Sequence, residues 1–173
     1  RAYFPSLSTS WNIANEKFLA NNETVNVLKF RASAGRVGST NVSDFAYLQF
    51  FQTTSSNLYN GTSAVVPSNT FPNKDIGWEE TNEINLGLDF EFFNSRLRGG
   101  VDVYARKTKG GLVNTPIPYE LGADTYFANF IDVSNRGVEV SLGGDIIKTE
   151  DFLWSANVNF SINRNKLDKL NGA

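Results

Sequence analysis

Residues 83–107 read EINLGLDFEFFNSRLRGGVDVYARK and alternate between apolar and polar side chains. Successive side chains of a β-strand point to opposite faces, so a period of two predicts amphipathic strands. The phase of the alternation shifts across Asn94-Ser95, which indicates a tight turn between two antiparallel strands. One face of this hairpin would carry only apolar side chains and glycine, namely Ile84, Leu86, Leu88, Phe90, Phe92, Leu97, Gly99, Val101, Val103 and Ala105.

The same period recurs along the chain, and six stretches are predicted to be strands. They are 1–11, 25–35, 83–92, 97–107, 136–147 and 152–163. A seventh run, 45–52, is apolar but alternates poorly, and we assign it to a long outer loop that could include a further strand. The pattern predicts an all-β, antiparallel fold.

Short and long connections alternate between these strands. The segments 93–96 and 148–151 are short polar turns, and 12–24 could hold a helical turn. The connections 36–82 and 108–135 are long and rich in Gly, Pro, Ser, Thr and Asn. In an up-and-down sheet this alternation puts all short turns at one end and all long loops at the other, as in outer-membrane barrels.

Composition excludes several functional classes. The 173 residues include no cysteine and no histidine, which removes thiolate nucleophiles, histidine triads and nearly all zinc sites. A net charge of −2 gives no basic footprint for nucleic acid. The carboxylate pair Asp89/Glu91 lies on one face of one strand, so we expect a polar wall rather than an enzyme. We also expect no catalytic residue, no metal and no cofactor. No apolar run reaches the length of about 18 residues that a transmembrane helix needs.

The apolar face of the last four strands has two interpretations. Its 21 positions include no charged residue, although 20% of the chain is charged. A core-facing sheet of a soluble β-sandwich, such as a carbohydrate-binding module, would show this pattern. Three features favour lipid: strands of about 10–12 residues, glycine on the apolar face, and aromatic residues beside the short turns. Those aromatics are Phe90, Phe92, Phe93, Phe152 and Trp154.

Several segments resemble one family, the SusC/RagA type of TonB-dependent outer-membrane transporters. YFPSLSTSW (3–11) with EKFL (16–19), LKFRASAGRVGS (28–39) and NRGVEVSLGGDII (135–147) are similar to strands of that family. The most specific match is WEETNEINLGLDFEFFNSRLRGGVDVYARKTKGGL (78–112), which resembles a W-E-x-T-x-x-x-N-x-G-L-D-F core and the following strand. Ala34, Val37 and Ser39 depart from the usual pattern. The loops at 40–74 and 113–130 match least.

The resemblance implies a barrel of about 22 strands with a plugged lumen in the outer membrane. It implies import of an oligosaccharide, glycan or peptide, with a SusD-like surface lipoprotein and the TonB-ExbB-ExbD complex as partners. Residues 1–173 would be part of the barrel domain. We expect the chain to be a piece of a longer protein, with the plug domain and the barrel termini outside it, because it starts at Arg1 and lacks methionine.

Strand phase adds an orientation to this interpretation. We expect Leu88, Phe90, Val140 and Phe160 to face lipid. The candidates for the outer loops, in contact with substrate or lid, are Tyr119, Tyr126 and Phe127. The residues expected to face the lumen are Asp89, Glu91, Arg98, Asp102, Arg106, Glu139 and Asp145.

Overall fold

The computed structural model describes residues 2–19, 21–41 and 44–170, which form strands with short connections. Two 3-10 turns, η1 (Ile13–Asn15) and η2 (Tyr119–Leu121), are the helical elements of the described part. The strands are β1 (Ser6–Asn12), β2 (Val25–Ser39), β3 (Phe51–Tyr59), β4 (Thr62–Pro67), β5 (Thr70–Phe71), β6 (Glu79–Phe92), β7 (Leu97–Pro116), β8 (Thr125–Lys148) and β9 (Leu153–Leu170). Within these residues, no helix has the length and apolar character needed to cross a membrane.

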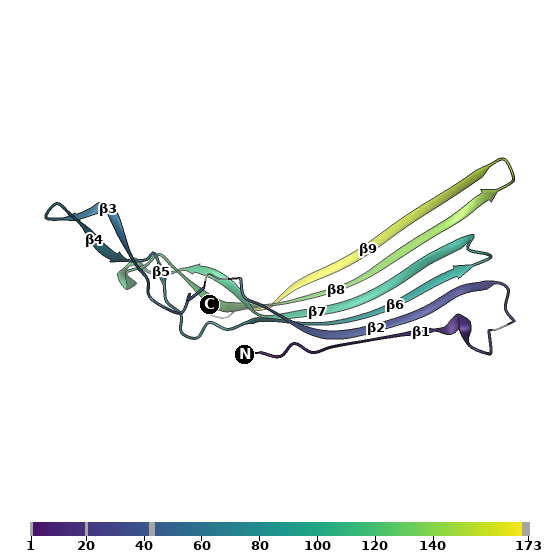
Figure 1. The fold of residues 1–173 in the computed structure, drawn as a ribbon, viewed down its shortest axis with the longest axis horizontal. Helices are drawn as coiled ribbons and strands as arrows, with labels where there is room; N and C mark the ends of the chain where they lie inside the picture. The colour runs from purple at the N-terminus through teal and green to yellow at the C-terminus, as the bar shows by residue number, and fades with distance from the viewer. Residues whose placement is uncertain (1, 20, 42–43, 171–173) are drawn as a thin grey trace. The chain divides into compact units, whose positions relative to one another are not determined.

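The chain divides into two compact units. Unit 1 contains Arg1–Val37, Thr81–Lys107 and Ser134–Lys166, and unit 2 contains Gly38–Glu80, Thr108–Val133 and Leu167–Ala173. In unit 1 the strands lie in the order β1-β2-β6-β7-β8, and β9 pairs with β8 (Figure 1). The strands of unit 1 are therefore arranged in the order in which they occur along the chain, as an antiparallel meander. The predicted all-β, antiparallel fold is confirmed.

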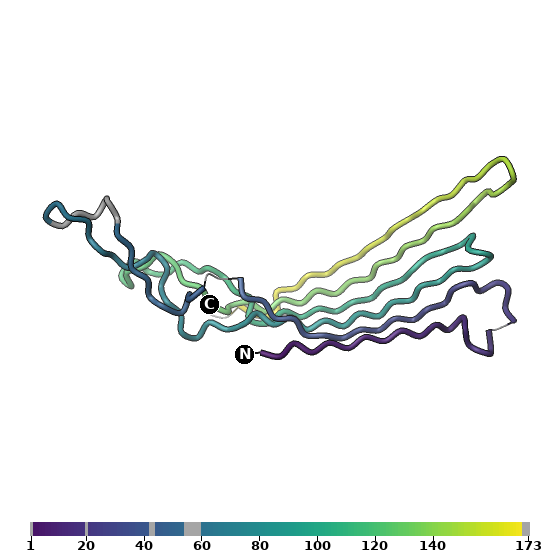
Figure 2. The backbone as a smooth tube through the Cα atoms, viewed as in Figure 1, coloured from purple at the N-terminus to yellow at the C-terminus, as the bar shows by residue number. Residues whose placement is uncertain are grey.

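The three short connections of unit 1 lie at one end of its sheet (Figure 2). They join β1 to β2, β6 to β7 and β8 to β9. The first contains η1, which confirms the helical turn expected within 12–24. In the second, Phe93, Asn94 and Ser95 have φ values of 58°, 54° and 61°. This run of left-handed residues reverses the chain and keeps both apolar rows on one face.

Cross-strand contacts fix which residues lie opposite one another. In β1 and β2, Leu7 pairs with Ala34 and Trp11 with Phe30, so their apolar residues share a face. Side-chain hydrogen bonds join Asn165 to Asn135 at 2.7 Å and Ser155 to Asp145 at 2.8 Å across β8 and β9. Both pairs imply the same register, and this register places the apolar rows of β8 and β9 on one face as predicted.

The long loop that we expected at 108–135 is not what the structure shows. Most of this segment is strand, because β7 continues to Pro116 and β8 begins at Thr125. Gly110, at φ 64°, forms an irregularity that side chains stabilise. Its N–H donates to Asp132 Oδ1 at 2.9 Å, and its carbonyl accepts from Asn129 Nδ2 at 2.6 Å. These bonds let a polar, glycine-rich sequence remain extended.

The other long connection, 36–82, also contains strands. Its β3 and β4 form a separate two-stranded sheet, and β5 pairs in parallel with the start of β8. The apolar run 45–52 is a turn at its start and enters β3 at Phe51. Strands β2, β6, β8 and β9 also extend beyond their predicted ends, whereas β1 begins only after Pro5. The described chain is thus richer in strand than its composition suggested.

The apolar face of unit 1 is not the interior of a β-sandwich. Val158 is 63% exposed and Phe160 57% exposed, although a sandwich would bury both. The buried hydrophobic residues of the described part are Ala123 and Ala128 alone, and no large side chain there is fully buried. A face this apolar needs cover, and the described residues do not provide a second sheet layer with a packed core.

The left-handed turn between β6 and β7 yields a stability prediction. Asn tolerates φ of 54° better than a β-branched residue does. Asn94→Val should therefore lower the free energy of unfolding by roughly 1–2 kcal/mol. Asn94→Gly should leave it unchanged or raise it slightly. Urea denaturation of the two variants and the wild type measures this difference, and equal midpoints for Val and Gly would contradict the turn geometry.

Candidate functional site on the polar face of the sheet

The polar face of unit 1 is organised around one arginine. Arg31 on β2 donates from Nε and Nη2 to both carboxylate oxygens of Asp89 on β6, at 2.8 and 2.9 Å. The same Nη2 lies 3.1 Å from Asp102 Oδ1 on β7. The paired, two-pronged geometry is the strong form of an arginine–carboxylate contact. A single guanidinium thus links three neighbouring strands.

Glycine makes this arrangement sterically possible. A Cβ atom at Gly87 would lie 2.6 Å from Arg31 Cζ and from Asp102 Oδ1. The glycine therefore leaves space for the guanidinium to cross β6. Gly137 on β8 does the same for Tyr104, whose ring atoms occupy the space that a Cβ would need.

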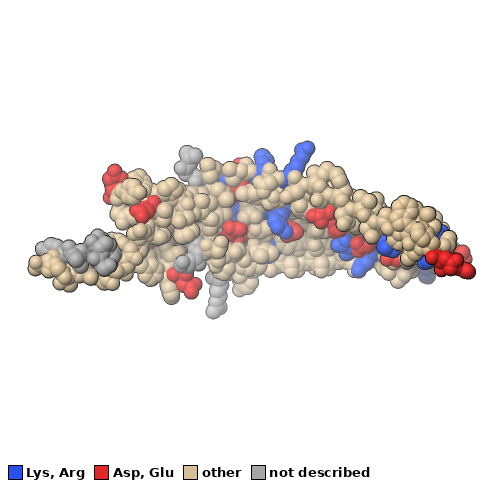
Figure 3. Space-filling model, turned by 90° about the horizontal axis from the view of Figure 1, so that it is seen from above, with Lys and Arg blue, Asp and Glu red and all other residues tan. Residues whose placement is uncertain are grey.

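Two further ion pairs cross strands on the same face. Arg106 on β7 donates to Glu83 Oε2 on β6 at 2.9 and 3.1 Å. Arg98 Nη1 lies 3.9 Å from Asp145 Oδ1 on β8, and that oxygen also accepts from Ser155 Oγ at 2.8 Å. In the space-filling view, blue and red groups lie interspersed among wide neutral areas (Figure 3). The charges of these residues largely compensate one another.

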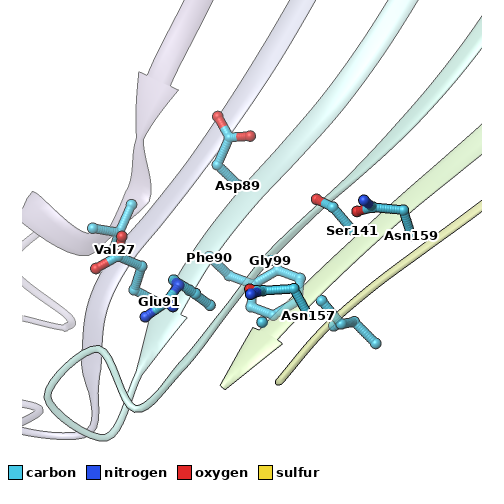
Figure 4. A pocket seen from close by; sticks show the side chains of 11 residues that line it. Val27, Asp89, Phe90, Glu91, Gly99, Ser141, Asn157 and Asn159 are labelled. Atoms are coloured by element: carbon cyan, nitrogen blue, oxygen red, sulfur yellow. The ribbon is translucent and has the colours of Figure 1, made fainter. Parts of the chain in front are cut away.

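A shallow hollow of about 280 Å³ lies beside the central arginine contact. Asp89, Glu91, Ser141, Asn157 and Asn159 line it from three strands, as Figure 4 shows. Its polar groups are carboxylates, a hydroxyl and amides, which suit water or a hydrogen-bonding solute. A second hollow includes Glu139 and Asp102. Glu91 also accepts a hydrogen bond from Ser95 Oγ at 2.7 Å.

The seven residues predicted for the lumen therefore belong to one face of one sheet. Six of them make a described ion pair or hydrogen bond, and Glu139 lines the second hollow. Sequence reasoning omitted Arg31 and Glu83 from the candidates. Their polar strand positions were visible in the alternation. Their importance depends on which residue of the next strand lies opposite, and the sequence does not reveal that.

The three outer candidates were expected in the long loop 108–135, and the structure places only Tyr119 outside the strands. Tyr119, in η2, is 81% exposed. Tyr126 and Phe127 lie within β8 rather than in a loop, so their side chains point to opposite faces of the strand. Tyr126 packs edge-on against Phe130, with ring centroids 5.6 Å apart. Of the three, Tyr119 is the most exposed, whereas Tyr126 and Phe127 are half-buried.

The acidic residues of the polar face have described partners or line a hollow. Within the described ranges, no three residues among Asp, Glu, His and Cys come together in a way that could hold a metal ion. The carboxylates named above are bonded to arginine or serine, or line an open hollow. Paired charges on a rigid sheet can position water and polar solutes, and they can dock against another polar surface.

Comparison with known proteins identifies the family to which this sheet belongs. The family described as "TonB dependent receptor-like, beta-barrel" matches residues 1–172. TonB-dependent receptor P39 of Formosa agariphila is 36% identical, and the match covers 96% of this chain and 16% of that protein. TonB-dependent receptor SusC of Bacteroides thetaiotaomicron is 34% identical, with 98% and 17% covered. The solved RagAB peptide transporter has a TM-score of 0.88 and 30% identity, with 99% and 18% covered.

The chain is an antiparallel meander with one apolar and one charged face. Together with these matches, this arrangement identifies it as part of the wall of a β-barrel. The chain belongs to the TonB-dependent receptor-like β-barrel family, and its likeness to SusC and to RagAB confirms the resemblance seen in its motifs. Members of this family are receptors and transporters. The chain spans 16–17% of the length of the curated relatives it matches.

The glycine beneath Arg31 gives a prediction for this face. Gly87→Ala should displace the guanidinium from its two carboxylates and lower the free energy of unfolding by about 1 kcal/mol, because the pair is partly exposed. Gly100→Ala is the matched control on the same face, since its nearest atoms would lie 3.4 Å away. It should change stability by less than about 0.5 kcal/mol.

The Gly87→Ala substitution in an Arg31→Ala background shows whether its effect on stability depends on the Arg31 side chain. Without the guanidinium, Gly87→Ala has no side chain to displace and should be nearly neutral. Chemical denaturation of the four proteins of this cycle measures the coupling. Additive effects of the two substitutions would show that Gly87 does not act through Arg31.

Proposed function

We propose that this chain forms part of the wall of a TonB-dependent barrel that imports a nutrient across the outer membrane. The observation that carries the proposal is the division of one sheet into two faces. One face has an uninterrupted apolar row on each long strand, and the other carries Arg31, Asp89 and Asp102 in contact. This division, within a family of receptors and transporters, supports a wall between lipid and a polar lumen.

The orientation of the sheet follows from its faces. Leu88, Phe90, Val140 and Phe160 would contact lipid, and the ion pairs of the polar face would line the lumen and meet the plug domain. The short turns would lie on the periplasmic side, as in barrels of this class. The long connections would then lie outside the cell, where Tyr119 is exposed enough to touch a lid protein or a solute.

The substrate class proposed is an oligosaccharide or a peptide. Relatives bear the names TonB-dependent receptor SusC and RagAB peptide transporter. We infer a SusD-like surface lipoprotein as lid and energy from the TonB-ExbB-ExbD complex, reached through a plug domain. The polar wall residues would hydrate and align the solute, and the chain would carry out no covalent chemistry.

Uptake by the full-length protein tests the function. Cells expressing it with its neighbouring lipoprotein should accumulate labelled oligosaccharides or oligopeptides, and deletion of TonB should abolish the accumulation. A small solute that crosses porins is the control and should enter equally in both strains. Equal uptake of the oligomers with and without TonB would contradict the proposal.

Charge placed on each face tests the orientation. Leu88→Arg would put a cation against lipid and should destabilise the barrel by roughly 2–4 kcal/mol near the midplane. Ser141→Arg is the matched control, because its side chain would join Asp89 and Glu91 at the polar hollow. Heat-modifiable mobility on gels and the amount of barrel in outer membranes measure the difference. Equal amounts of the two variants would contradict this assignment of the faces.

A further inference from the structure

The apolar face ends in basic residues at the end of the sheet away from the short turns. The alternation that places Val138 and Ile162 on this face places Arg136 and Arg164 next in line. Arg36 on β2 and Lys107 on β7 hold the corresponding positions after Ala34 and Ala105. Basic residues therefore follow the apolar row directly on β2, β7, β8 and β9, whereas β6 continues in the same phase through Asn82 to Glu80.

Arg136 and Arg164 lie directly across from each other. Asn135 on β8 and Asn165 on β9 are joined by a hydrogen bond of 2.7 Å and lie opposite each other. Arg136, which follows Asn135, therefore lies opposite Arg164, which precedes Asn165. Both arginines are exposed. Like charges at opposed positions of an antiparallel pair repel each other, so this arrangement costs stability unless an anion lies between them.

An apolar hollow begins at these two arginines. It has a volume of about 510 Å³, and Arg136 and Arg164 line it together with Ile84, Leu86, Val103, Val138 and Ile162. Ile84 is 56% exposed and Ile162 51% exposed, so the hollow is open on the side away from the sheet. An apolar channel with two guanidiniums at its edge matches a molecule that has hydrocarbon at one end and an anion at the other.

We propose that this hollow binds a membrane lipid with a phosphate-bearing head group. An acyl chain would lie over Ile84, Val138 and Ile162, and the phosphate would accept hydrogen bonds from Arg136 and Arg164. The site lies at the end of the sheet that the proposed function places in the outer leaflet, and it rests on that function for its position in the membrane. The residues concerned lie on the face opposite the solute path.

Lipid binding to the purified full-length protein tests this site. The probe is diphosphoryl lipid A in mixed micelles with a zwitterionic detergent, and native mass spectrometry counts bound lipid. Arg136→Gln/Arg164→Gln should weaken binding roughly 30-fold, the factor expected when two basic residues near a lipid surface are neutralised. Arg96→Gln/Lys148→Gln, which removes two exposed charges near the short turns, is the matched control and should bind as the wild type does.

Two further probes identify the part of the lipid that is recognised. Lipid A lacking both phosphates should bind the wild type no better than the diphosphoryl form binds the double variant. Inorganic phosphate at millimolar concentration should not displace the lipid. Equal binding of the wild type and the Arg136→Gln/Arg164→Gln variant, equal binding of the dephosphorylated lipid, or displacement by phosphate alone would each overturn the proposal.

Gel mobility and uptake assays on the same proteins keep the two proposals separate. The double variant should still form a heat-modifiable barrel and import the nutrient at or near the wild-type rate, because its substitutions lie on the lipid side. Lipid binding without uptake in the wild type would count against the transport function alone. Uptake with unaltered lipid binding in the double variant would count against the lipid site alone.

Discussion

Backbone hydrogen bonding between neighbouring strands is the constraint on which the rest of this structure depends. Hydrocarbon offers no partner to an N–H or a carbonyl, so a strand that crosses a bilayer must bond to strands on both sides. Strands β2, β6, β7 and β8 meet this requirement within the sheet. Once the strands are so paired, side-chain alternation alone decides which residues meet lipid and which meet water.

The polar face shows how a charged wall remains ordered beside water. Arg31 contacts Asp89 and Asp102, and the two carboxylates come from different strands. Such contacts contribute little free energy each, because all three side chains are partly exposed. Their effect is geometric, since the fork of one guanidinium aligns three strands at a single level. Gly87 supplies the space that this crossing needs.

The sequence predicted this sheet where a period of two is uninterrupted. The alternation on either side of Asn94-Ser95 is sufficient for β6, β7 and their common apolar face. It fails over 108–135, because Gly110, Asn129 and Asp132 are typical of loops, and here their mutual hydrogen bonds hold two strands extended. It also fails for the contact of Arg31 with Asp89, since 58 residues separate them and register across β2 and β6 cannot be read from composition.

Strands β2, β6, β7 and β8 each have a bonded neighbour on both sides. Their backbone groups are therefore satisfied within the sheet, and these four strands offer no free edge to which a strand of another molecule could add.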